Sequence, residues 1–187
     1  SEHRRVLRPR QRIDKPVAGD LIAAGGDVEV EAPVSGDVLL TGGNLRLGAA
    51  VGQGLYAAGG KLSVNGSVGR NARIAGGKVD LGPAAQVAGN LTVGGGDVTL
   101  KGAVKGYVQV GGGRVLIDGL VQGDVTARAG RLELGPNARI GGKLRYANRE
   151  EPKHDAAAQI AGGIERISLP GRAAELHKDL LERFGKQ

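Results

Sequence analysis

The 187-residue chain has no cysteine, tryptophan or methionine, and only three tyrosines and one phenylalanine. Without cysteine it forms no disulfide, thiolate metal site or thiol nucleophile. Aromatic rings supply much of the buried area of an ordinary globular core, so their scarcity argues against such a core. No apolar run approaches the roughly 18 to 20 residues of a membrane-spanning helix, and we therefore expect a soluble chain.

Glycine is abundant, with 35 residues, and 40% of the chain is hydrophobic, mostly small aliphatic residues. This apolar content is too high for simple disorder. The combination favours a repetitive fold in which thin layers stack and each layer buries small side chains against the next.

The chain repeats itself at a spacing of 17 residues, which lengthens to 19 twice and to 20 once. The repeats begin at Val17, Val34, Val51, Val68, Val87, Val104, Val121, Ile140 and Ile160. The two 19-residue steps carry their extra residues at the same phase, around Gly82-Pro83 and Gly135-Pro136. Insertions at one phase predict loops along one edge of a solenoid.

Positions 5, 7, 12 and 14 of the repeats are aliphatic, whereas position 13 is mostly polar. This alternation predicts strands with positions 12 and 14 inward and position 13 outward, and the opening valine predicts a third short segment. Gly-Gly recurs at positions 9 and 10 from Gly25-Gly26 to Gly112-Gly113, and predicts a corner with positive φ in every layer. The sequence thus predicts an all-β parallel β-helix over residues 17–167, with coils of about 17 residues stacked about 4.8 Å apart.

A left-handed hexapeptide helix was the competing interpretation of the aliphatic columns. That fold needs aliphatic residues at positions 1, 7 and 13, but position 13 carries Glu29, Arg46, Asp80 and Glu133. The pattern therefore disfavours a hexapeptide-type transferase.

The recurring Val-x-Gly-Asp/Asn-Leu and Gly-Gly-x-Val-x-Leu segments, over residues 17–148, resemble the bactofilins and related bacterial polymer-forming proteins. The resemblance implies a right-handed β-helix of triangular section that assembles end to end at or in the bacterial cell envelope, as a scaffold rather than an enzyme. It implies self-association or an envelope protein partner. It favours the periplasmic side, with a membrane-associated cytoplasmic location as the alternative. Some relatives carry membrane-anchoring helices, and this sequence shows none.

Residues 1–16 are predicted to form a basic N-terminal arm, with six basic residues against two acidic ones. An arm of this kind can contact an anionic membrane surface, although a solvated terminus is the commoner outcome. It lacks the aromatic residues on which single-stranded nucleic acid stacks, so we expect no nucleic-acid partner. The candidate contact residues are Arg4, Arg5, Arg8, Arg10, Arg12 and Lys15.

Residues 168–187 are predicted to form a C-terminal amphipathic α-helix, because their apolar residues recur with helical spacing. The end of a solenoid exposes both backbone groups and core, so this helix is expected to cap that end or to dock a partner through Leu176, Leu180 and Phe184. The polar segment 149–155 is expected to remove the second strand of the eighth coil. Removal of residues 170–187 is expected to expose the core and promote polymers or aggregation.

Position 6 carries Ile22, Leu39 and Tyr56 in the first three repeats, and polar residues in the later ones. Three outward apolar side chains on successive layers form a contiguous patch, which we predict to be an interaction surface.

Residues for catalysis or metal binding are not grouped in the sequence. His3, His154 and His177 lie in three separate segments, and the Gly-Gly-Lys triplets lack the spacing of a phosphate loop. Aspartates at position 4 alternate with other residues, which is typical of turns rather than of a calcium ladder. We predict no catalytic, metal or cofactor site. Two alternatives to a scaffold stay open: a β-helical module that binds or processes glycans, and a basic adaptor that uses residues 4–15 on an anionic surface.

Overall fold

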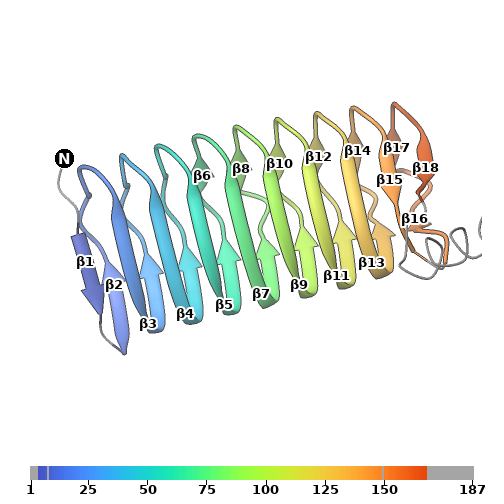
Figure 1. The fold of residues 1–187 in the computed structure, drawn as a ribbon. Helices are drawn as coiled ribbons and strands as arrows, with labels where there is room; N and C mark the ends of the chain where they lie inside the picture. Colours follow the sequence, from blue (N-terminus) through green and yellow to red (C-terminus); the bar gives the residue numbers. More distant parts are fainter. Residues whose placement is uncertain (1–3, 8, 149, 168–187) are drawn as a thin grey trace, which may run out of the picture.

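The computed structural model describes residues 4–7, 9–148 and 150–167, which form one stack of parallel β-coils (Figure 1). The stack contains about nine turns, and the described residues contain no helix. The predicted all-β parallel solenoid is therefore confirmed. Its handedness stays a prediction, and the predicted C-terminal helix lies outside the described residues.

Each central coil contributes one long strand of ten residues. These strands are β3 (Leu21–Val30), β4 (Val38–Leu47), β5 (Leu55–Val64), β7 (Ala72–Leu81), β9 (Leu91–Leu100), β11 (Val108–Ile117) and β13 (Val125–Leu134). Two-residue strands complete the later coils: β6 (Ser67–Val68), β8 (Gln86–Val87), β10 (Ala103–Val104), β12 (Leu120–Val121), β14 (Arg139–Ile140) and β17 (Gln159–Ile160). The N-terminal end carries β1 (Arg4–Leu7) and β2 (Arg10–Ile13), and the C-terminal end carries β15 (Leu144–Tyr146), β16 (Lys153–His154) and β18 (Ile164–Arg166).

The strands belong to two parallel sheets that run the length of the stack. The larger has the order β1-β3-β4-β5-β7-β9-β11-β13-β15-β18, with β2 also beside β3 and β16 beside β13. The smaller has the order β17-β14-β12-β10-β8-β6, and isolated bridges between Val17, Val34, Val51 and Val68 continue its line. Every pairing joins equivalent positions of neighbouring coils, as in Leu55 with Ala72.

The core is one continuous cluster that extends along the axis from Ile13 to Tyr146. Positions 5 and 7 of each repeat, in the first half of its long strand, are buried, and so are positions 12 and 14, in the second half, as predicted. The alternation shifts by one residue at the Gly-Gly pair between them, so the chain must bend there for both halves of the strand to face inward. The N-terminal half of each long strand thus forms what we call the first face, and its C-terminal half the second face.

The glycine corners do not have the conformation that the sequence predicted. Among the described residues, positive φ occurs only at Gly19 and Gly163, and neither belongs to a Gly-Gly pair of the long strands. At the Gly-Gly corners, glycine is required because adjacent coils approach closely. A Cβ at Gly42 would collide with the backbone oxygen of Gly25, and one at Gly59 with that of Gly42. The bend brings adjacent coils too close for a side chain between them.

A row of Asp and Asn side chains at position 4 joins adjacent coils. Asp20 Oδ1 accepts the backbone N–H of Asp37 at 2.7 Å, and Asp37 Oδ1 accepts that of Gly54 at 2.8 Å. In the same way Asn90 Oδ1 accepts the backbone N–H of Tyr107 at 3.0 Å, and Asp124 Oδ1 accepts that of Lys143 at 2.8 Å. These residues therefore satisfy the backbone of the next coil, rather than only their own turn as the sequence suggested.

The solenoid begins before the predicted boundary at residue 17. Strand β1 pairs with Leu21–Ala24 and β2 with Asp27–Val30, so part of the predicted arm forms an additional coil. Arg8-Pro9 stands in the sequence where later repeats have Gly-Gly, which is why the repeat was not evident there. At the other end, β16 pairs with Glu133–Leu134. The eighth coil therefore has a short second strand, although the sequence predicted that this strand would be missing.

Candidate interaction surfaces

The predicted apolar patch lies on the first face over β3, β4 and β5. Ile22 is paired in register with Leu39, and Leu39 with Tyr56. Their exposed fractions are 42%, 43% and 42%, so all three side chains face solvent together. The row ends on the next coil at Arg73, which is paired with Tyr56. We call Ile22, Leu39 and Tyr56 the apolar stripe; that it binds a partner stays a prediction.

The candidate cations of the N-terminal segment are not gathered on a separate arm. Arg10 and Arg12 lie on β2, and Lys15 follows it as an exposed residue. Arg12 donates to the Glu31 carboxylate at 2.7 Å, and this hydrogen bond raises the pKa of Arg12. Arg4 and Arg5 lie on β1, whereas Arg8 lies outside the described residues. An adaptor that uses residues 4–15 would therefore act through the end of the solenoid.

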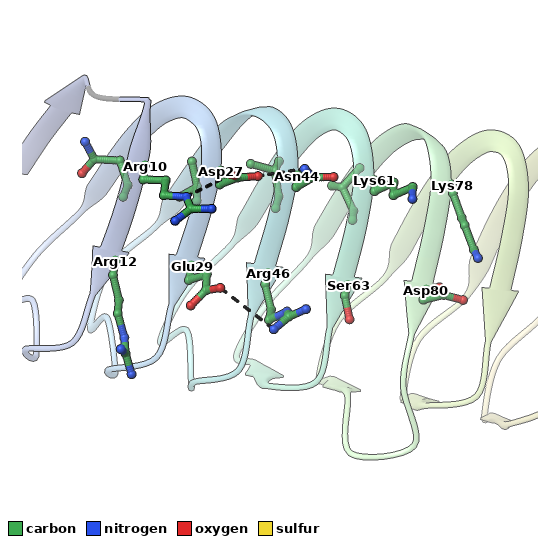
Figure 2. Close-up of a pocket in the computed structure, with 14 residues that line it drawn as sticks. Arg10, Arg12, Asp27, Glu29, Asn44, Arg46, Lys61, Ser63, Lys78 and Asp80 are labelled. Carbon is green, nitrogen blue, oxygen red and sulfur yellow. Dashed lines mark hydrogen bonds and ion pairs between the residues drawn. The ribbon is translucent and has the colours of Figure 1, made fainter.

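A hollow of about 720 Å³ lies on the second face over β2, β3, β4, β5 and β7. We call it the groove. Its floor is the sheet itself, and its outward side chains form two rows, at positions 11 and 13 (Figure 2). The position 11 row is Arg10, Asp27, Asn44, Lys61 and Lys78; the position 13 row is Arg12, Glu29, Arg46, Ser63 and Asp80. Adjacent members of a row are one coil apart, about 4.8 Å.

The charges at the N-terminal side of the groove are largely compensated. Arg10 Nε lies 3.5 Å from the Asp27 carboxylate, which also accepts a hydrogen bond from Asn44 Nδ2 at 2.8 Å. Arg46 lies 4.0 Å from Glu29. These contacts join coils side by side, as the dashed lines in Figure 2 show.

Lys61 and Lys78 differ from Arg10 and Arg46, because they are paired in register with each other. Both are exposed, and neither has an ion-pair partner among the described residues. Like charges directly opposite one another on a sheet repel. Both lysines belong to Gly-Gly-Lys triplets, which the sequence excluded as phosphate loops, and their pairing at position 11 of adjacent coils was not predicted.

The N-terminal end of the core contains an unsatisfied donor. Gln11 occupies position 12, which is aliphatic in the later coils, and it is only 7% exposed. Its Nε2 has no hydrogen-bond partner among the described residues. A buried amide donor without an acceptor costs about 1–3 kcal/mol, so an acceptor supplied from outside the coil would relieve that cost.

The C-terminal end of the core is only partly covered by the described residues. Ile164 pairs with the fully buried Leu144 but is itself 44% exposed. Arg166 on β18 donates to the backbone oxygen of Asn148, which follows β15 on the preceding layer, at 2.8 Å. Leu176, Leu180 and Phe184, the predicted capping or docking residues, lie outside the described residues.

Among the described residues, no three His, Cys, Asp or Glu side chains come together as a potential metal site. His154 is exposed on β16, paired with Leu134. Within the same residues there is no helix with the length and apolar character of a membrane span. No family model, curated protein or solved structure matches the chain.

Proposed function

We propose that the protein is a non-enzymatic structural scaffold of the bacterial cell envelope, which assembles with further copies through the ends of a right-handed solenoid. One observation carries this proposal: the stack is continuous, and each end presents a layer that has no neighbour among the described residues. Within these residues, β1 and β2 pair only with β3, and Gln11 Nε2 has no hydrogen-bond partner; at the other end β18 pairs only with β15, and Ile164 is exposed.

End-to-end pairing would satisfy backbone groups as well as bury side chains. A terminal strand has a row of backbone donors and acceptors on one side, which another strand can satisfy. Inside the stack, every long strand has such a neighbour on both sides. Pairing of two ends would extend the same arrangement across molecules. The envelope location and the handedness rest on the family resemblance.

Assembly should be examined by sedimentation velocity and electron microscopy over a concentration series. We expect species larger than a monomer, with a share that rises with protein concentration. The N-terminal end is tested by Gln11→Glu, which places a carboxylate in the terminal layer. Gln109→Glu is the matched control, because it makes the same change at an exposed position in the middle of the stack.

The C-terminal end is tested by Ile164→Lys. Its control is Leu120→Lys, because the two residues are equally exposed, at 44% and 45%, but Leu120 lies on the side of the stack. Thermal unfolding identifies variants that no longer fold. A wild-type protein that stays monomeric at every concentration, or folded end variants that assemble as their controls do, would refute the proposal.

A further inference from the structure

We infer that the groove on the second face binds an extended acidic polysaccharide, with Lys61 and Lys78 holding a carboxylate of the polymer between them. The site lies on the side of the solenoid, so this inference goes beyond the scaffold function proposed above and does not require it.

The cations of the groove differ in whether an acidic residue lies on the adjacent coil. Arg10 and Arg46 each face an acidic residue of the adjacent coil. Lys61 instead has Asn44 on one neighbouring coil and Lys78 on the other. Two ammonium groups one coil apart repel each other, and an anion placed between them converts that repulsion into two charge-assisted contacts.

Lys78 also has an acidic residue beside it, Asp97 on the following coil. The two do not form an ion pair, and Asp97 is not part of the groove. Asp80, which does line the groove, lies two residues from Lys78 on the same strand. An anion bound between Lys61 and Lys78 therefore lies among groups of both signs, which limits the charge density that the groove accepts.

The shape of the groove suits a linear polymer. The groove spans β2 to β7, four strand spacings or about 19 Å along the axis of the stack. It is open and shallow enough that its floor is formed by the strands themselves, including Val28, Leu45 and Leu62. Such a surface accommodates a linear chain lying across successive coils better than a compact small molecule, which pockets enclose on most sides.

The lining of the groove fits a polysaccharide better than a nucleic acid. Duplex DNA carries one negative charge per about 1.7 Å of axis. The groove places Asp27, Glu29 and Asp80 among its cations, and these carboxylates would repel so dense a polyanion. None of the described residues that line it is aromatic, so bases would have no ring to stack on there.

A polymer with sparse carboxylates and many hydroxyl groups matches both the charges and the hydrogen-bonding groups of the lining. Its carboxylates fit between Lys61 and Lys78, while its hydroxyls can donate to the acidic side chains and exchange hydrogen bonds with Asn44 and Ser63. The mixture of cations, carboxylates and neutral polar groups in the groove is thus complementary to an acidic polysaccharide.

Binding should be measured by isothermal titration or biolayer interferometry with polygalacturonate, a homopolymer of a uronic acid. Fully methyl-esterified polygalacturonate is the ligand control, because it keeps the sugar chain and removes the charge. An oligonucleotide of thymidine serves as the nucleic-acid probe. We expect binding of polygalacturonate that weakens with salt, and no binding of the ester at the same concentration.

The variant that tests the site is Lys61→Gln with Lys78→Gln. Its matched control is Arg114→Gln with Arg131→Gln, which removes two cations that are also paired in register at position 11 but lie outside the groove. We expect the lysine variant to bind about tenfold more weakly or worse, equivalent to about 1.4 kcal/mol. The arginine variant should bind as the wild type does.

Three results would overturn the inference. The wild type could fail to bind polygalacturonate, or the two double variants could lose affinity equally, which would indicate attraction by net charge alone. Tighter binding of the oligonucleotide through Lys61 and Lys78 would make the groove a nucleic-acid site instead. Sedimentation of the same variants separates this test from that of the scaffold, because the groove variants leave both ends unchanged.

Discussion

On the first face, β3, β4 and β5 present Ile22, Leu39 and Tyr56 to solvent, whereas the same position in β9, β11 and β13 carries Thr92, Gln109 and Thr126. On the second face, the groove covers β2 to β7 and does not reach β9. The N-terminal half, residues 4–81, therefore carries both candidate surfaces on the sides of the stack, the apolar stripe and the groove. The C-terminal half, residues 91–166, repeats the same coil with a polar exterior on the first face.

The interior does not show this difference. Leu55 in the N-terminal half and Leu91 in the C-terminal half are both fully buried in the same column. The comparison teaches that the coil is specified by its inward positions and its glycines, so that the outward positions can vary along the stack. Binding surfaces can then be placed on part of a solenoid without changing its fold.

The largest effect is expected from truncation of the buried column. Leu55→Ala and Leu91→Ala should each lower the free energy of unfolding by about 2–5 kcal/mol, because each removes a side chain from a closely packed layer. Chemical denaturation measures both, with Thr92→Ala as an outward control. If only one of the two variants lowers the free energy of unfolding, the cores of the two halves are not equivalent.

The glycine corners should be the next most sensitive positions. Gly42→Ala and Gly112→Ala should each cost about 1–3 kcal/mol, because a Cβ at either position collides with a backbone oxygen of the preceding coil. Gly94→Ala is the control, because the nearest atom to its Cβ would be the Gly111 oxygen at 3.9 Å. If all three glycines tolerate alanine equally in thermal unfolding, close approach does not explain their presence.

Substitutions in the apolar stripe should change association and leave stability nearly intact. Leu39→Lys with Tyr56→Lys should weaken association by about tenfold or more, since two charges would have to be desolvated at a contact. Thr92→Lys with Gln109→Lys makes the same change in the same row of the C-terminal half and should have little effect. Sedimentation equilibrium compares the two; equal association constants would mean that the stripe is not an interface.

The smallest effect is expected at the edge of the N-terminal half, where Arg12 pairs with Glu31. Both side chains are exposed, and exposed ion pairs contribute little to stability. Glu31→Gln should lower the melting temperature slightly at low salt, and the difference should disappear at high salt. A large loss that persists in high salt would mean that this contact anchors the terminal coil.

Much of the fold followed from periodicity. The aliphatic columns identified the inward positions, and the outward placement of Ile22, Leu39 and Tyr56 followed from the same alternation. The first coil was missed because Gln11 interrupts its column and Arg8-Pro9 replaces its glycines. The groove was missed because its charged residues belong to different repeats, and nothing in one repeat indicates which cation has an acidic neighbour.

The sequence by itself determined the coil: its length, its inward columns, its parallel stacking and the apolar stripe all follow from residues within one repeat and their recurrence. Only the tertiary structure decided why glycine stands at the corners, which cations are compensated and where the solenoid begins. The physical reason is that these properties depend on contacts between coils, across 17 or more residues of chain. Register and close approach set those contacts, and a local pattern specifies neither.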